Sequence, residues 1–239
     1  MRRSLAILSM LATLLLAACG GGGGGGGSSD PGVTSPPPTT TPPTASFAAT
    51  EAYRTYTASA RQQSFTMSPF GFCAGGATQT ETAPVVATFE GAPARRKTIT
   101  LAMSFSNCTP PTLTRTGDIY LNTTNDQIGL SSSAGYVVLD RPLVLPAVLK
   151  VGDSATLATG TRYSDATKST VIGAVTYGLE TRADDRADAI LLRMTAVFGG
   201  NVGMPFTELR IFRLTSAGTL ELVSMSTDEN SNLFIFNPR

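Results

Sequence analysis

The sequence predicts an all-β fold, an antiparallel meander of long hairpins that forms a barrel or a curved half-barrel. Three observations predict it. Apolar residues recur at every second position in several stretches, turn-forming residues interrupt the chain about every ten residues, and no helix recurs between these stretches to join strands in parallel. Charged residues make up only 15% of the chain, which is typical of a β-rich domain outside the cytoplasm.

The 239-residue chain divides into three segments. Residues 1–18 have the character of a signal peptide, residues 19–44 form a linker, and residues 45–239 are expected to fold as a single β domain. This last segment is long enough to bury a substantial core.

One segment of the β domain favours a helix, and the others favour strands. Residues 45–63 form the helix candidate, because three side chains would share a face at helical spacing: Tyr53, Tyr56 and Ala60. The clearest strand covers residues 98–105, where these apolar side chains point one way: Ile99, Leu101, Met103 and Phe105.

The same alternation continues along the chain. Further strands are expected over residues 171–180 and 192–198. Shorter strands are expected over residues 85–90, 118–122, 136–139 and 233–236, and the last of them would close the sheet. Turns that separate strands of about ten residues are expected at residues 152–153, 164–165, 184–185, 199–201, 216–218 and 228–230.

The N-terminal residues have the organisation of a secretory signal peptide. Arg2 and Arg3 precede an apolar stretch from Leu5 to Ala18. The alternative is a membrane-spanning helix. Fourteen residues at about 1.5 Å each reach about 21 Å, which is short of the roughly 30 Å hydrocarbon core, so the signal peptide is favoured.

The end of this segment, Leu16-Ala17-Ala18-Cys19, resembles the lipobox of bacterial lipoproteins. The resemblance covers residues 1–20 and implies cleavage before Cys19 and acylation of its thiol. In this family an Asp after the cysteine favours retention in the inner membrane of Gram-negative cells. Gly20 stands here, so the resemblance implies transport to the outer membrane and a cell-envelope location, on either the periplasmic or the surface face. Several acyl chains would make the anchor effectively permanent.

The linker begins with eight consecutive glycines, Gly20–Gly27, and continues into a Pro/Thr segment from Pro31 to Thr44. It has almost no apolar side chains that could offset the entropy lost on ordering, so it is expected to stay unfolded and extended. It is either a passive spacer or a tether whose reach matters for function.

Three cysteines remain to be assigned after the signal peptide is placed. Lipid on Cys19 would leave Cys73 and Cys108 as an even pair in an oxidising compartment. We expect a disulfide between Cys73 and Cys108. The alternatives are two free buried thiols or one reactive thiol.

The composition excludes several kinds of chemistry. The chain has no histidine, which excludes Ser-His-Asp catalysis and His-ligated metals, and its net charge of +1 gives no basic excess for nucleic acid. No nucleophile elbow or phosphate-binding loop is found. We therefore expect a non-enzymatic protein with no catalytic residues, no metal and no cofactor.

Four clusters have both a functional and a structural interpretation. Acidic groups at 184–188 and at 228–232 have oxygen ligands that calcium could use, but each lacks a complete loop, and a solvated turn is favoured. Arg95-Arg96-Lys97 could contact anionic lipid, but a solubilising turn is favoured. The apolar residues over 65–72 could line a lipid pocket or plug the barrel, but core packing is favoured.

Two classes of function remain, with a weaker third. The first is a membrane-anchored lipoprotein whose tethered β domain is a non-enzymatic envelope module, either structural or bound to an envelope protein. The second is a carrier of a lipid or other hydrophobic ligand in a β-barrel cavity, which requires a cavity of about 300 Å³ or more. The third is a hydrolase that uses two carboxylates facing one cleft.

Overall fold

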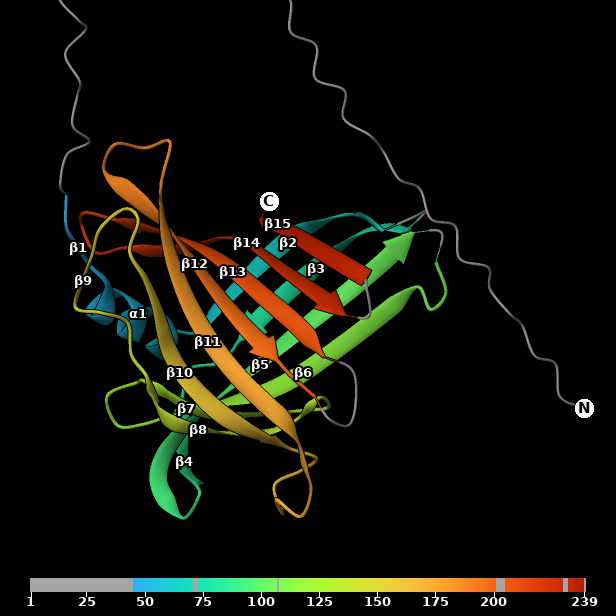
Figure 1. Cartoon of the computed structure of the whole chain (residues 1–239). Helices are drawn as coiled ribbons and strands as arrows, with labels where there is room; N and C mark the ends of the chain where they lie inside the picture. Colours follow the sequence, from blue (N-terminus) through green and yellow to red (C-terminus); the bar gives the residue numbers. More distant parts are fainter. Residues whose placement is uncertain (1–44, 71–72, 107, 201–204, 230–231, 239) are drawn as a thin grey trace, which may run out of the picture. The chain divides into compact units, whose positions relative to one another are not determined.

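Twelve antiparallel strands form a closed barrel in the computed structural model of the chain (Figure 1). The structure describes residues 45–70, 73–106, 108–200, 205–229 and 232–238. Residues 43–239 form one compact unit. The signal peptide, Cys19 and the linker lie outside the described residues, so the predictions made for them stay predictions.

One short helix and fifteen strands make up the described residues. In chain order they are β1 (Phe47–Ala48), α1 (Ala49–Ala58), β2 (Arg61–Phe70), β3 (Cys73–Glu81), β4 (Val85–Phe89), β5 (Ala92–Ser106), β6 (Thr112–Leu121), β7 (Gln127–Ser132), β8 (Gly135–Leu143), β9 (Val148–Leu149), β10 (Ser154–Tyr163), β11 (Val171–Ala183), β12 (Ala189–Phe198), β13 (Phe206–Thr215), β14 (Leu220–Glu229) and β15 (Asn232–Pro238).

The barrel follows the order of the chain. Each barrel strand pairs with the next one along the sequence, and β15 pairs with β2 to close the ring, with Phe236 opposite Met67 and Pro238 opposite Phe65. β4 pairs only with β5 and lies outside the ring, while β1 and β9 form a separate two-stranded sheet. The predicted meander is confirmed, and its two alternatives resolve to the closed barrel.

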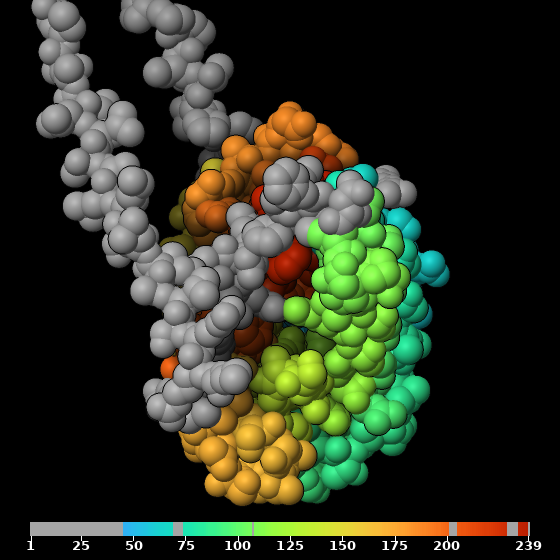
Figure 2. Space-filling model, turned by 90° about the vertical axis from the view of Figure 1, so that its right-hand side faces the viewer, coloured from blue at the N-terminus to red at the C-terminus, as the bar shows by residue number. Residues whose placement is uncertain are grey.

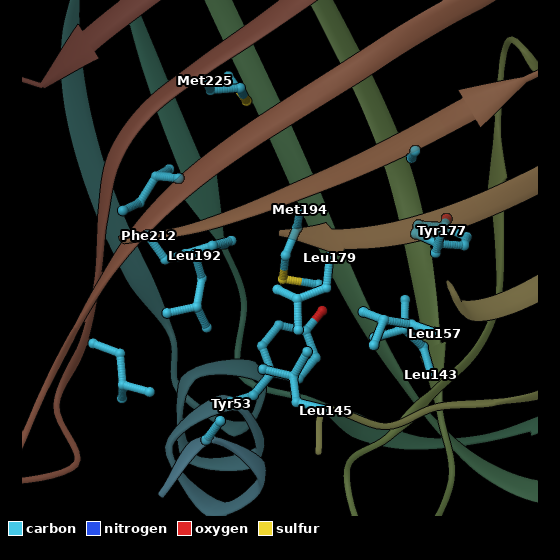
Figure 3. Close-up of a cluster of buried hydrophobic side chains, with 14 of the residues drawn as sticks. Tyr53, Leu143, Leu145, Leu157, Tyr177, Leu179, Leu192, Met194, Phe212 and Met225 are labelled. Atoms are coloured by element: carbon cyan, nitrogen blue, oxygen red, sulfur yellow. The ribbon is translucent and has the colours of Figure 1, made fainter. Parts of the chain in front are cut away.

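The alternating pattern places apolar side chains inside the barrel. On β12, Ile190, Leu192 and Met194 are buried, whereas Arg193 and Thr195 on the other face are partly exposed. Figure 3 shows side chains of this kind converging from several strands above α1. Each large aliphatic side chain buried in this way contributes about 1.5–3 kcal/mol.

Helix α1 is shorter than predicted. It ends at Ala58 rather than near residue 63, because the chain becomes extended at Ser59 and residues 61–70 form β2. Pairing of β2 with β3 and β15 overrides the helical spacing of Tyr53, Tyr56 and Ala60. Among the described residues, no helix is long and apolar enough to cross a membrane.

All of the predicted strands are present, and the turn predicted over residues 228–230 begins too early. β14 continues to Glu229, which pairs with Phe206, so Asp228 lies inside a strand rather than in a turn. The long pairing with β13 outweighs the turn preference of the Asp228 to Asn230 segment. β2, β3 and β7 were not predicted, because Gly, Gln, Ser and Thr interrupt their apolar pattern.

The two cysteines of the predicted bridge lie near the ends of two neighbouring strands, β3 and β5. β3 begins at Cys73, and the next residue, Ala74, lies opposite Ser106, two positions before Cys108. Cys108 is disulfide-bonded. The side chain of Cys73 lies outside the described residues, so the Cys73–Cys108 pairing stays a prediction.

A second, smaller apolar cluster lies on the outside of the barrel under β4. The Phe89 ring stacks on Tyr120, with ring centroids 4.4 Å apart, and contacts Tyr136 at 5.5 Å. Gly129 on β7 makes room for this ring, because a Cβ atom there would lie 2.1 Å from Phe89 Cζ and 2.6 Å from the Val137 carbonyl oxygen. The hairpin of β4 and β5 therefore depends on a missing side chain.

We expect Gly129→Ala to lower the free energy of unfolding by about 1–3 kcal/mol, because the methyl group overlaps a ring and a backbone oxygen. Gly178→Ala on β11 is the matched control, since a Cβ there would have 4.0 Å to its nearest neighbour, Ala155 O. The control should be neutral or stabilising by up to about 1 kcal/mol. Urea unfolding checks both, and equal stabilities for the two variants would contradict the prediction.

Candidate functional site

A cavity of about 440 Å³ occupies the inside of the barrel. Figure 2 shows the hollowed end of the barrel, opposite the end that carries α1. Side chains from α1 and ten of the twelve barrel strands line this cavity, so most of the ring contributes to its walls. Two turns at the hollowed end, the β7–β8 turn and the β12–β13 connection, contribute Ser133 and Pro205 to the lining.

Most of the lining is apolar. The inward faces of several strands supply six large side chains: Leu101, Met194, Phe198, Phe206, Phe212 and Met225. Phe198 and Phe206 lie opposite each other on β12 and β13, and their rings stack with centroids 4.2 Å apart. The cavity can therefore accept an apolar group, with aromatic rings near its open end.

Two hydrogen-bonded pairs add polar groups to these walls. Glu208 and Arg210 both face inward on β13 and form an ion pair in which about a quarter of each side chain is exposed. Burial lowers the pKa of Arg210, but the carboxylate of Glu208 and its neighbours raise it more, so the guanidinium stays charged. Gln127 Nε2 donates to the hydroxyl of Tyr177 at 3.2 Å.

Helix α1 closes the other end and forms the cavity floor. Tyr53 lines the cavity, and its burial raises the pKa of the hydroxyl to about 12. Tyr56, one turn further along α1, packs edge-on against Phe212 with ring centroids 5.1 Å apart. The hydroxyl at the floor is thus neutral and available as a hydrogen-bond donor.

A buried charged cluster fixes the end of α1. Lys97 is 2% exposed; its Nζ lies 2.7 Å from Glu81 Oε2 and donates to the carbonyl oxygens of Thr57 and Ser59 at 3.1 and 2.7 Å. Burial lowers the pKa of Lys97, and Glu81 opposes that effect. A cation here satisfies carbonyls at the C-terminus of the helix that have no partner within it.

The expected role of Lys97 in a solubilising or lipid-contacting turn is wrong. Arg95, Arg96 and Lys97 lie within β5 rather than at a turn, so alternate side chains point to opposite faces. Arg96 lies 3.9 Å from Asp118, and Lys97 is buried with Glu81. No local pattern indicates this inward position, because a Lys on a strand usually faces water.

A second ion pair holds α1 to the β6–β7 turn. Arg54 donates from two nitrogens to the two carboxylate oxygens of Asp126, at 2.8 and 2.9 Å, and the Asp126 side chain is 5% exposed. Burial would raise the pKa of Asp126, but hydrogen bonds from Arg54, Thr124 and Asn122 outweigh it and hold the pKa below its ordinary 3.8. Helix α1 is the plug at this end of the barrel, and a bidentate ion pair therefore holds it in place.

Asp126→Asn should lower the free energy of unfolding by about 1–3 kcal/mol at neutral pH, because Arg54 loses its buried charged partner and keeps only the exposed Glu51. The folded-state pKa is below the unfolded one, so the stabilisation is present above pH 3.8 and is lost as pH falls through the folded pKa. The difference between the two proteins should shrink at low pH.

Urea unfolding at neutral pH and at pH about 3 measures this difference. Asp185→Asn is the control: its side chain is 84% exposed, and its removal should change stability by no more than about 0.5 kcal/mol. An Asp126→Asn protein as stable as the parent at neutral pH would show that the pair does not hold the plug.

Arg162 is the most unusual polar residue of the lining. It faces inward on β10, is 6% exposed, and its Nε and Nη2 donate to the Ala134 carbonyl oxygen at 2.9 and 2.5 Å. Its guanidinium lies 5.4 Å from the Phe206 ring centroid, and its Nη1 has no hydrogen-bond partner. Burial lowers the pKa of Arg162.

The clusters singled out in the sequence do not build this cavity. Asp184 binds Arg213, which holds its pKa well below the usual range, so this turn carries a salt bridge. Phe65 and Met67 are buried in the main core, whereas Phe72 and Asn230 lie outside the described residues. No group of three or more metal-ligating His, Cys, Asp or Glu side chains occurs in the described part of the chain.

A hydrolase of the two-carboxylate kind needs two acids that face one cleft, but only one acid among the described lining residues faces inward. Glu208 faces inward but is paired with Arg210. Asp118 also borders the cavity, yet its carboxylate accepts a hydrogen bond from Thr98 at 2.6 Å, on the strand face opposite to that of Lys97. These two acids therefore do not face a common cleft.

Sequence reasoning missed the residues that line the cavity. Arg162, Glu208, Arg210 and Gln127 looked like ordinary polar positions of outward strand faces. The only signal was a charged residue on the apolar side of an alternating strand.

No protein-family model, curated protein or solved structure matches the chain.

Proposed function

We propose that the protein is a ligand-binding module that carries an elongated apolar small molecule in its barrel. The cavity is the observation that supports this proposal. Its 440 Å³ lies within the range of small-molecule sites and above the roughly 300 Å³ that a carrier requires. A purely structural barrel has no need for an open interior.

The chemistry of the lining favours binding of an apolar body with a few polar groups. Aromatic and thioether side chains from several strands contribute to the wall, and methionines such as Met194 and Met225 adapt to different ligand shapes. The polar groups nearby, Gln127 with Tyr177 and Glu208 with Arg210, are already paired with each other. They can orient a ligand without leaving a buried group unsatisfied.

The proposal includes a lipid anchor at Cys19, followed by the Gly/Pro/Thr linker. The support for the anchor is the Leu16-Ala17-Ala18-Cys19 sequence. A permanent anchor would keep the carrier at the membrane surface, and the linker would allow its barrel to reach a donor or acceptor of the ligand. Binding of an envelope protein by the same barrel is the alternative use of this tether.

We expect Cys19→Ser to move the protein from the membrane fraction to the soluble periplasmic fraction, because no thiol remains to be acylated. Gly20→Asp is the informative companion: it should keep the protein on membranes but shift it from the outer to the inner membrane. Fractionation on a density gradient with immunoblotting checks both. Membrane association of the Cys19→Ser protein would refute the anchor.

The cavity itself is tested by filling it. Ala196 on β12 lines the cavity, whereas its neighbour Val197 is 45% exposed on the outer face. Ala196→Phe should weaken binding of the neutral apolar probe N-phenylnaphthylamine by about tenfold or more, because the ring occupies space that the probe needs. Val197→Phe should bind the probe like the parent.

The measurement is a fluorescence titration of residues 43–239, a unit that contains every strand pairing and the α1 plug. Circular dichroism confirms that both variants are folded. If the parent domain does not bind the probe, or if the two variants bind it equally, the carrier proposal is wrong and the envelope-module alternative gains support.

A further inference from the structure

Among the described residues that face the barrel interior, Arg162 is a buried cation without an anionic partner. Lys97 pairs with Glu81, and Arg210 pairs with Glu208. Among the described residues, no carboxylate lies within ion-pair distance of Arg162, which is 6% exposed. A guanidinium removed from water without a counter-charge is unfavourable, so this position is complementary to an anion that the described residues do not supply.

The neighbouring strands leave Arg162 without a counter-charge. Val137 on β8 and Gly173 on β11 lie directly opposite it, and neither carries a polar side chain. Gly173 cannot be replaced by a larger residue without a shift, because a Cβ atom there would lie 1.9 Å from the Gly199 carbonyl oxygen. The flanking positions therefore supply no charge to Arg162.

The orientation of the guanidinium is fixed by the backbone. Two of its nitrogens share the Ala134 carbonyl oxygen in the β7–β8 turn, and this leaves Nη1 without a partner. Nη1 is shielded from solvent, and the half-buried Phe206 ring lies beside the guanidinium. Rotation of this ring would open Nη1 to a ligand in the cavity.

We propose that Arg162 binds the carboxylate of an amphipathic ligand whose apolar chain fills the barrel cavity. This inference rests on the proposed carrier function and specifies its ligand class. The chain of the ligand extends from Arg162 along Phe198 and Phe206 toward Met194 and Tyr53 at the floor. The Ser132 and Ser133 hydroxyls at the β7–β8 turn border the same cavity and can donate to the second carboxylate oxygen.

A singly charged carboxylate fits the position beside Arg162 better than a phosphate ester does. Only one guanidinium nitrogen is unpartnered, and one charge-assisted hydrogen bond matches one carboxylate oxygen. A doubly charged phosphate group in a buried place would require several unpaired cations to offset its desolvation. The structure assigns the site to monocarboxylates such as fatty acids.

The test compares three ligands that share one apolar chain and differ only at the head: dodecanoate, dodecanol and dodecylamine. Residues 43–239 are titrated by displacement of N-phenylnaphthylamine at neutral pH. We expect dodecanoate to bind about ten- to a hundredfold more tightly than dodecanol, and dodecylamine to bind most weakly, because only the carboxylate pairs with Arg162. Equal binding of the three ligands would overturn the inference.

Variants locate this preference at one residue. Arg162→Met should bind dodecanoate and dodecanol equally while it retains binding of N-phenylnaphthylamine, which shows that the cavity is intact. Arg162→Lys keeps the charge and should restore part of the preference. Arg182→Met, which removes a 57% exposed arginine on the outside of β11, should leave the preference unchanged.

The outcomes separate this inference from the proposed function. A purely structural Arg162 would give the Met variant lower stability but the same carboxylate preference as the parent, and this result would refute the inference. If the parent domain binds the neutral probe without any preference among the three ligands, the carrier function stands and the assigned ligand class is wrong. If no ligand and no probe binds, both proposals fail. If the Arg162→Met variant does not fold, the comparison of the three ligands on the parent domain decides whether the inference is correct.

Discussion

The rest of the structure depends on the width of the closed barrel. In a barrel of about eight strands, the interior is just narrow enough for side chains to fill it. The diameter of a barrel grows with the number of strands. Here twelve strands close through β15 and β2, so the inward side chains of opposite walls cannot all meet. Helix α1 and the residues around it, such as Phe212 and Leu214, fill one end. The remaining volume at the other end is the cavity.

The polar groups inside the barrel follow from the same geometry. A wide interior that is partly open can tolerate ionised side chains, but each must be paired. At the plug, Lys97 pairs with Glu81 and donates hydrogen bonds to the last carbonyls of α1. Arg54 of α1 forms an ion pair with Asp126 at the rim of the barrel. These ion pairs fix the position of α1 more than they stabilise the fold. Removing one partner leaves a buried charge unpaired, whereas forming the pair gains little free energy beyond the cost of desolvating its two charges. Arg162 is buried without a paired carboxylate in the described part of the chain, which distinguishes it from these residues and makes it the candidate anion-binding residue.

The sequence predicted the strands that alternate strictly and failed where local and tertiary preferences differ. Residues 98–105, 171–180 and 192–198 are strands because one of their faces is apolar without interruption. The helix over 45–63 was too long, since a strand pairing with a segment far along the chain decides where it ends. Period-two alternation also cannot tell the inside of a barrel from the covered outer patch under β4. The cavity depends on strand number and plug position, which no local pattern contains, so its lining residues were missed.

The two ends of the barrel are held differently, and this difference bears on function. At the plug, a bidentate ion pair, a two-stranded sheet and a buried lysine fix α1, so the floor with Tyr53 is rigid. At the hollowed end, the guanidinium of Arg162 ties β10 to the β7–β8 turn through a single carbonyl oxygen. Local opening is easiest where few buried contacts hold the chain. A ligand of the proposed class that entered there would contact a fixed floor, adaptable walls and the buried guanidinium of Arg162, and any affinity for the folded barrel alone would also stabilise that barrel.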